Sequence, residues 1–151
     1  MKALLLAHIA ATLLMTGVIL FVQLVHYPLF NRVGTSAFAA YEAAHTSAIT
    51  CLVMPLMLVE LFTALLLAVQ PPHGVSPLIF WIGFGLVLVI WCSTAFLQVP
   101  QHGRLSTGFD EAAYRALVMT NWVRTVAWCL RAGLMLVVLA QLLALPASNT
   151  P

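Results

Sequence analysis

The segment Asn121-Trp122-Val123-Arg124-Thr125-Val126-Ala127-Trp128-Cys129-Leu130-Arg131 decides how this chain folds. It lies inside an apolar run of bilayer length, yet it carries an amide and two guanidinium groups. At about 100° per residue, Asn121, Arg124, Trp128 and Arg131 fall on one stripe of a helix. A charge in hydrocarbon costs at least about 2.5–3.5 kcal/mol, so charged side chains within a membrane face other helices. The stripe therefore predicts a bundle whose other helices supply polar partners.

The composition indicates a membrane protein. The 151 residues are 63% hydrophobic and only 7% charged, which is more apolar surface than a soluble domain of this size buries. The net charge of +2 is small and scattered, which argues against a nucleic-acid partner. Cys51, Cys92 and Cys129 lie within apolar runs without CxxC spacing, so we expect them to be reduced packing residues.

Four apolar runs are each long enough for a transmembrane helix. They cover roughly residues 3–27, 46–69, 78–99 and 117–145. Pro28 and Pro100 are expected to stop the first and third helices, and Pro55 to kink the second. Residues 1–151 thus form one integral membrane domain of the all-α class, a four-helix transmembrane bundle.

The connections after the first and third spans are long and look largely helical. Thr35 or Ser36 can cap a helical extension over about residues 36–45, and Thr107 can cap another over about 108–116. The second and fourth helices are therefore expected to project beyond the membrane on one face.

Basic residues favour one orientation in the membrane. Arg32, Arg104 and Arg115 lie on the two long connections, whereas only Lys2 lies on the opposite side. The positive-inside rule then places the long connections in the cytoplasm and both termini outside. We expect an integral protein of a bacterial inner membrane.

An internal repeat surrounds the two prolines. The segments 28–42 and 100–115 share, in order, a proline, an arginine, a threonine and an Ala-Ala-Tyr sequence. This similarity predicts two repeated helical hairpins, with a site where the hairpins meet. Chance similarity in so apolar a chain is the alternative.

Polar side chains gather at the depth where the long connections join the spans, counted at about 1.5 Å per residue. All four helices contribute, with Gln23, His26, His45, Gln98, His102, Asn121 and Arg124. This convergence predicts a ligand-binding or catalytic site near the cytoplasmic face. The alternative, for any one of these residues alone, is a side chain that extends toward lipid headgroups.

Deeper in the bundle, Glu60 and Arg131 are the only opposite charges at one level, roughly 22 Å from the same face. We expect them to form an ion pair that fixes the packing of the second helix against the fourth. Trp122 and Trp128 flank the arginine stripe and could wall a pocket for a flat aromatic ligand.

Two cofactor hypotheses find less support. A haem could lie between His26 and His45, or between His45 and His102, but both pairs lie at the membrane edge and no CxxCH occurs. A zinc or iron site built on these histidines needs a carboxylate, for which Glu42 is the nearest candidate, and no HxxxH or HExxH spacing is present. We therefore assign no cofactor and predict no metal ligands.

Short motifs connect the chain to a known family. The chain resembles the anthrone-oxygenase-like family of small four-helix membrane proteins in the order of its motifs. These are an apolar span, Val99-Pro100 at its end, Arg104 four residues later, and then Asn121-Trp122-Val123-Arg124-Thr125. The segment His26-Tyr27-Pro28-Leu29-Phe30-Asn31-Arg32 is similar to the Pro-Leu-Asn-Arg element of that family. The chain departs from the pattern at Gln101-His102-Gly103. The resemblance implies cofactor-free oxygenation of anthrones, and a polar site that includes Asn31, Arg32, Asn121 and Arg124.

Two functions from different classes remain open. In the first, a membrane enzyme uses His45 or His102 as a general base on an acidic C–H or O–H group of a hydrophobic aromatic substrate, while Arg124 and Asn121 hold the developing oxyanion. In the second, a non-catalytic accessory subunit uses the same groups, with Gln23 and His26, to bind a quinone, a lipid headgroup, a haem or metal, or a partner. Homo-oligomerisation is compatible with both functions.

Overall fold

The computed structural model describes residues 1–144, and every regular element in that range is helical. The elements with α labels are α1 (Lys2–Phe21), α2 (Thr35–Val69), α3 (Pro77–Ser93), α4 (Val99–Leu105) and α5 (Glu111–Ala144). A π-helical turn (Val22–His26) and a 3-10 turn (Tyr27–Arg32) extend α1, and a second π-helical turn (Thr94–Gln98) joins α3 to α4. The predicted end of the last span at Leu145 lies outside the described residues.

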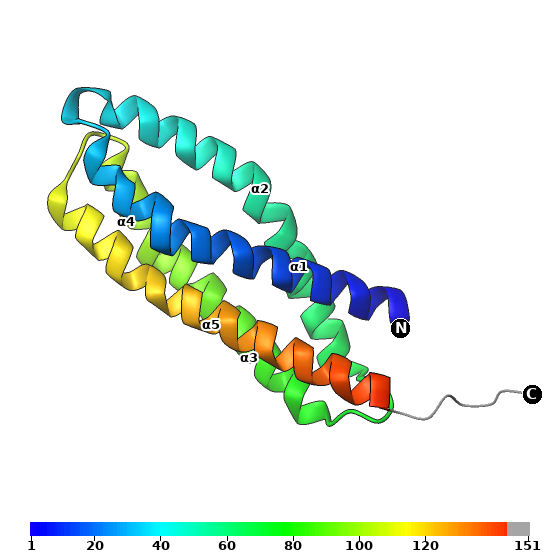
Figure 1. The fold of residues 1–151 in the computed structure, drawn as a ribbon. Coiled ribbons are helices and arrows are strands. Elements are labelled where there is room, and N and C mark those ends of the chain that lie inside the picture. The colour runs from blue at the N-terminus through cyan, green and yellow to red at the C-terminus, as the bar shows by residue number, and fades with distance from the viewer. Residues whose placement is uncertain (145–151) are drawn as a thin grey trace, which may run out of the picture.

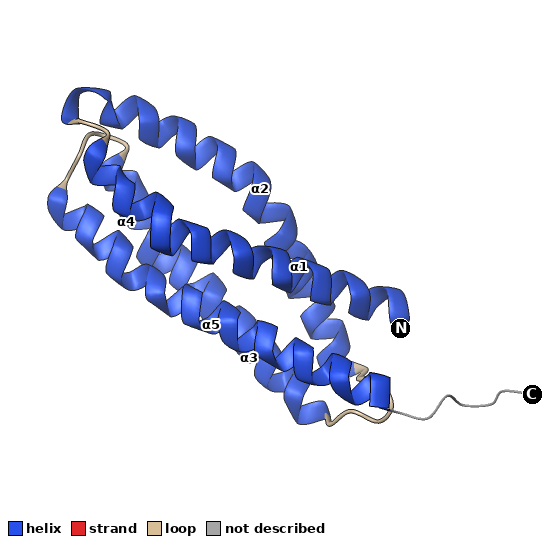
Figure 2. Cartoon of the chain, in the orientation of Figure 1, coloured by secondary structure: helices blue, strands red, loops and turns tan. Residues whose placement is uncertain are grey.

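The predicted four-helix bundle is confirmed (Figure 1, Figure 2). Four continuous helical stretches are long and apolar enough to cross a bilayer, Lys2–Arg32, Thr35–Val69, Pro77–Leu105 and Glu111–Ala144, as expected of an integral membrane protein. With its 35 residues, α2 measures about 50 Å at 1.5 Å per residue, well beyond a hydrocarbon core of about 30 Å. The repeat of the two hairpins stays a prediction.

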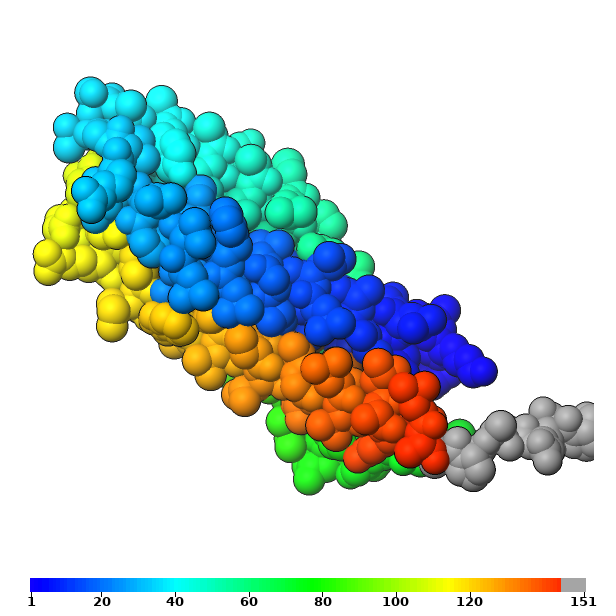
Figure 3. All heavy atoms as spheres, viewed as in Figure 1, coloured from blue at the N-terminus to red at the C-terminus, as the bar shows by residue number. Residues whose placement is uncertain are grey.

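The four helices stand at the corners of a square. Around it, α1 adjoins α2 and α5, and α3 adjoins the same two helices, so α1 faces α3 and α2 faces α5 across the diagonals. On the face shown in Figure 3, α1 lies between α2 and α5.

The core is divided into three layers along the bundle. One layer lies near the short α2–α3 connection and includes Leu67 and Phe80. The middle layer surrounds Met15 and Trp128. The third lies near the long connections and contains Val22, Tyr27, Phe30, Phe38, Leu105, Ala113 and Leu117. We call this third layer the apolar plug.

The helix stops predicted at Pro28 and Pro100 are wrong, because helix continues through both prolines to Arg32 and Leu105. Each proline occupies the first turn of a new helical segment, where its missing N–H needs no partner. In both places a five-residue π-helical turn comes directly before that segment. Such wide turns often occur at functional sites. Pro55 lies inside α2, which continues through it.

The predicted helix caps are also wrong. Gly34, whose φ of 84° suits glycine, precedes α2, and neither Thr35 nor Ser36 caps it. At α5, Asp110 accepts hydrogen bonds from the N–H groups of Ala112 and Ala113, at 2.9 and 3.0 Å. Accordingly α5 begins at Glu111 rather than near residue 108.

Candidate functional site

The arginine stripe of α5 points into the bundle, as its helical spacing predicts. Asn121 and Trp128 are fully buried, and Arg124 and Arg131 are 9% and 1% exposed. The four side chains contact two separate polar networks, one near the long connections and one deeper in the bundle.

The deeper network contains the predicted ion pair. Arg131 Nη1 lies 2.5 Å from Glu60 Oε1, with both side chains 2% exposed. Trp128 Nε1 donates to the other carboxylate oxygen at 2.9 Å, and Arg131 Nη2 donates to Thr12 Oγ1 at 3.3 Å. The prediction for Glu60 and Arg131 is confirmed, and Trp128 belongs to the same pair.

His8 lies beside the deeper network and has its own partner. Its Nδ1 is 2.7 Å from Thr63 Oγ1, and both side chains are buried.

The network near the long connections begins at Gln23. Its Nε2 donates to the carbonyl of Val118 at 3.2 Å, and its Oε1 accepts from Asn121 Nδ2 at 2.7 Å. Asn121 Oδ1 in turn accepts from Arg124 Nε at 2.9 Å and from Arg124 Nη2 at 2.5 Å. The amides of Gln23 and Asn121 thereby fix the orientation of the guanidinium.

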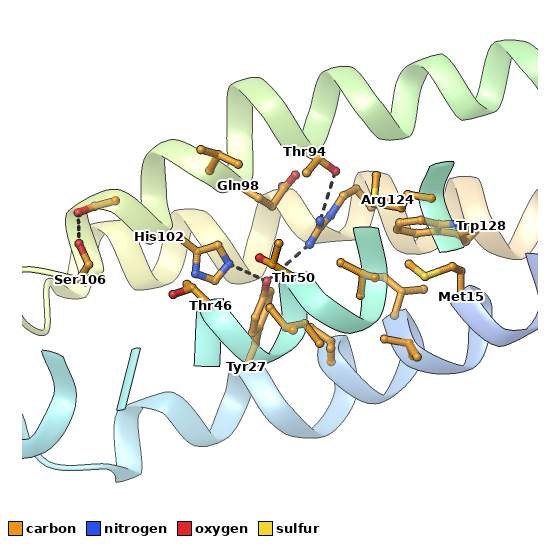
Figure 4. Close-up of a pocket in the computed structure, with 18 residues that line it drawn as sticks. Met15, Tyr27, Thr46, Thr50, Thr94, Gln98, His102, Ser106, Arg124 and Trp128 are labelled. Atoms are coloured by element: carbon orange, nitrogen blue, oxygen red, sulfur yellow. Dashed lines mark hydrogen bonds between the residues drawn. The ribbon is translucent and has the colours of Figure 1, made fainter. Parts of the chain in front are cut away.

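Arg124 is a buried cation without a direct anionic partner. Besides Asn121, it donates to Thr94 Oγ1 at 3.3 Å and to the hydroxyl oxygen of Tyr27 at 3.5 Å (Figure 4). Within residues 1–144, no carboxylate lies within ion-pair distance of its guanidinium. A guanidinium held this way is well suited to stabilise an oxyanion on a ligand.

Tyr27, His102 and Glu42 form a hydrogen-bonded chain that ends at Arg124. His102 Nδ1 lies 2.5 Å from Glu42 Oε1, and His102 Nε2 lies 3.0 Å from the Tyr27 hydroxyl. This geometry suits the tautomer in which His102 Nδ1–H donates to the Glu42 carboxylate and Nε2 accepts the Tyr27 O–H. Glu42 is fully buried, and its Oε2 has no hydrogen-bond partner in the described part of the chain.

The other two predicted histidines lie beside this chain. His26 Nε2 and His45 Nδ1 are 2.9 Å apart, and the His45 ring centroid lies 5.6 Å from that of His102. The predicted convergence of three histidines is confirmed. Because the rings of His26 and His45 touch, no haem plane fits between them as they stand. No set of three or more His, Cys, Asp or Glu side chains in residues 1–144 is arranged to hold a metal ion.

A cavity of about 410 Å³ lies against this network. Its polar end carries Tyr27, His102 and Arg124, while Met15 and Trp128 line the opposite end (Figure 4). Met57, which also lines the cavity, packs in the same core layer as Met15 and Trp128. A second groove of about 440 Å³ runs along α1 and α2, is lined by apolar side chains such as Phe21 and Leu52, and includes His26 and His45.

Three predicted site residues lie elsewhere. Asn31 and Arg32 are exposed at the end of the first helical stretch. Trp122 is 43% exposed and does not line the cavity, so the expectation that it walls a pocket is not met, whereas Trp128 does line it. At 100° per residue, Trp122 lies on the side of α5 away from the stripe.

Two members of the hydrogen-bonded chain are not evident from the sequence. Tyr27 stands out there only as part of a proline motif, and Glu42 only as a candidate metal ligand. The available signal was spacing, because Glu42 lies one helical turn before His45 and therefore on the same face of α2.

Comparisons of the chain with protein-family models, curated proteins and solved structures give no match. The likeness to anthrone-oxygenase-like proteins thus rests on the motifs alone.

Proposed function

We propose that this protein is a membrane-embedded enzyme that removes a proton from a hydrophobic aromatic substrate and stabilises the resulting oxyanion. The observation that carries the proposal lies at one end of the cavity. There the buried Arg124 guanidinium, which pairs with no carboxylate of residues 1–144, meets the hydrogen-bonded chain of Tyr27, His102 and Glu42. The apolar remainder of the cavity suits the hydrophobic body of such a substrate.

The hydrogen bonds supply a direction for the proton. The substrate proton passes to the Tyr27 oxygen as the Tyr27 proton passes to His102 Nε2, and Glu42 stabilises the imidazolium. The new negative charge on the substrate oxygen remains beside Arg124. Before the transfer the site holds the Glu42 carboxylate and the Arg124 guanidinium. After it, Glu42 is paired with the His102 imidazolium, and Arg124 is paired with the substrate oxyanion.

The finer proposal is cofactor-free oxygenation, which the motif resemblance favours. An anthrone-type methylene would react as R₂CH₂ + O₂ → R₂C=O + H₂O. One oxygen atom enters the ketone and the other leaves as water, and the electrons that reduce O₂ come from the two C–H bonds. The proton stored on His102 returns to the departing water.

Binding and turnover are tested separately in proteoliposomes. Replacing Trp81, Trp91 and Trp122 by phenylalanine leaves Trp128, which lines the cavity, as the only tryptophan. The binding probe is 4-bromo-1-naphthol, whose bromine quenches tryptophan, and 1-bromonaphthalene serves as the probe without an oxygen. Arg124→Gln should remove the preference for the naphthol, a loss of about ten- to a hundredfold for a hydrogen bond to a charged group.

Turnover is measured as O₂ consumption with anthrone. Tyr27→Phe and His102→Gln should lower the rate about 10²- to 10⁴-fold while quenching by the naphthol persists. Tyr114→Phe and His73→Gln, outside the cavity, are the matched controls and should retain full activity. Naphthol binding without any proton abstraction or O₂ uptake would favour the accessory-subunit alternative, and the absence of both would refute the proposed function.

For location, we propose a bacterial inner membrane with the long connections in the cytoplasm. Support comes from Arg32, Arg104 and Arg115 at that end against Lys2 at the other. Reporter fusions at the N-terminus and after residue 107 should give opposite topologies.

A further inference from the structure

We propose that the cavity opens sideways into the lipid between α2 and α4, and that an amphipathic, lipid-dissolved ligand enters through this gap. This inference rests on the proposed function and adds the route and the physical class of the ligand.

The exposed lining residues locate the opening. Four residues both line the cavity and are exposed on the surface, Thr50 on α2, Val99 and Gly103 on α4, and Ser106 directly after α4. The lining residues from α1 and α5 are buried or half-buried, among them Met15, Arg124 and Trp128. The rim of the cavity therefore lies between α2 and α4.

Both ends of the cavity are closed along the bundle axis. Toward the long connections lies the apolar plug, in which Phe30, Phe38, Leu105 and Leu117 are fully buried. Toward the opposite face, Trp128 and Met57 end the cavity, and the Glu60–Arg131 pair follows behind Trp128. A ligand thus has no axial route to water through these layers.

The surface beside the rim is apolar. Met54 on α2, one helical turn after Thr50, and Val99 on α4 are 39% and 58% exposed, and Phe96, three residues before Val99, is 74% exposed. Such side chains are in contact with acyl chains when the helices span a bilayer. The gap consequently faces the compartment in which hydrophobic molecules dissolve.

The α4 side of the rim is polar at one end only, which indicates an amphipathic ligand. Ser106 and the His102 side chain lie toward the long connections (Figure 4). There Arg104 pairs with Asp110 on the exposed surface. Val99 lies farther toward the hydrocarbon, one helical turn before Gly103. A molecule with its oxygen at headgroup level and its apolar body below it passes this rim without reorienting.

Gly103 provides a direct test. A Cβ at this position meets no atom within 4 Å, so Gly103→Leu adds bulk at the rim without a clash at that atom. Gly133→Leu on α5 has the same freedom, lies away from the cavity and is the matched control. Binding of 4-bromo-1-naphthol is followed by stopped-flow quenching of Trp128 in proteoliposomes of the single-tryptophan protein.

The expected result for Gly103→Leu is a fall in the association and dissociation rate constants by the same factor, about tenfold for a barrier raised by 1.4 kcal/mol, with Kd unchanged. Gly133→Leu should change neither rate. Naphthol binding with unchanged rates in Gly103→Leu, or a change confined to dissociation and Kd, would overturn the side opening and leave the proposed function intact. No quenching in the unsubstituted protein would overturn both.

A second measurement needs no variant at the rim. The naphthol is compared, at equal aqueous concentration, with a homologue that carries an added alkyl chain and partitions more strongly into lipid. Access from lipid predicts an association rate that rises with the lipid–water partition coefficient of the probe. Equal association rates for the two probes at equal aqueous concentration would overturn the inference even if Gly103→Leu failed to fold.

Discussion

Replacing Glu60 by glutamine should destabilise the bundle by about 3–5 kcal/mol, the cost of stranding one member of a buried ion pair. Glu60 accepts from Arg131 at 2.5 Å and from Trp128 at 2.9 Å. In Glu60→Gln the single amide oxygen can accept from only one of these two donor positions. The NH₂ group then faces the other donor, Trp128 or Arg131, and no hydrogen bond forms between them. Arg131, 1% exposed, would retain Thr12 at 3.3 Å as its remaining partner.

The double variant Glu60→Gln with Arg131→Gln separates pairing from packing. It leaves no unpaired charge, so it should be more stable than either single variant, with a coupling energy of about 0.5–3 kcal/mol. Unfolding is followed by far-ultraviolet circular dichroism as the mole fraction of sodium dodecyl sulfate rises in mixed micelles. Glu111→Gln, which breaks the exposed pair with Arg115, is the control and should cost less than about 0.5 kcal/mol.

One comparison of variants decides whether Glu60 and Arg131 stabilise one another. If the double variant is no more stable than Glu60→Gln alone, the two charges do not stabilise one another and the loss comes from elsewhere in the core.

Three further predictions concern stability. Thr63→Val should cost about 1–3 kcal/mol in the same unfolding assay, because buried His8 Nδ1 loses its partner at 2.7 Å, and an unchanged stability would mean that the contact contributes nothing. Trp128→Phe should lose about 1.5–3 kcal/mol with the hydrogen bond to Glu60, and should cost less than Glu60→Gln; the reverse order would contradict the proposed geometry. The N–H of Ala113, and next the Arg104 guanidinium, hold the pKa of Asp110 below its ordinary value, so its contribution to stability is complete above that value and disappears as the pH falls through the lowered pKa. Melting temperatures between pH 6 and 2 should show an acid-dependent loss that is smaller in Asp110→Asn, and identical profiles would contradict this assignment.

The fold and the deeper ion pair were predictable because few alternatives existed. Lipid admits only helices and closed β-barrels, and the long continuous apolar runs of this chain lack the alternating pattern of barrel strands. Glu60 had only one opposite charge at its depth. The inward direction of Asn121, Arg124, Trp128 and Arg131 followed from helical spacing alone.

The details that failed depend on local backbone geometry. Treating Pro28 and Pro100 as helix stops ignored that proline is tolerated in the first turn of a new segment, here after a π-helical turn. The change of helix type also moves Tyr27 and His102 relative to a regular helix. Their meeting at 3.0 Å therefore could not be read from a uniform 100° spacing.

The two diagonals of the bundle are each bridged by side chains at a different level. Glu60 reaches from α2 to Trp128 and Arg131 on α5, and Tyr27 reaches from the end of the first helical stretch to His102 on α4. Links across both diagonals oppose a sliding of the four helices that would shorten one diagonal and lengthen the other. If two opposite helices moved closer together, the hydrogen-bonded side chains between them would be compressed. The cavity therefore keeps its width before a ligand binds.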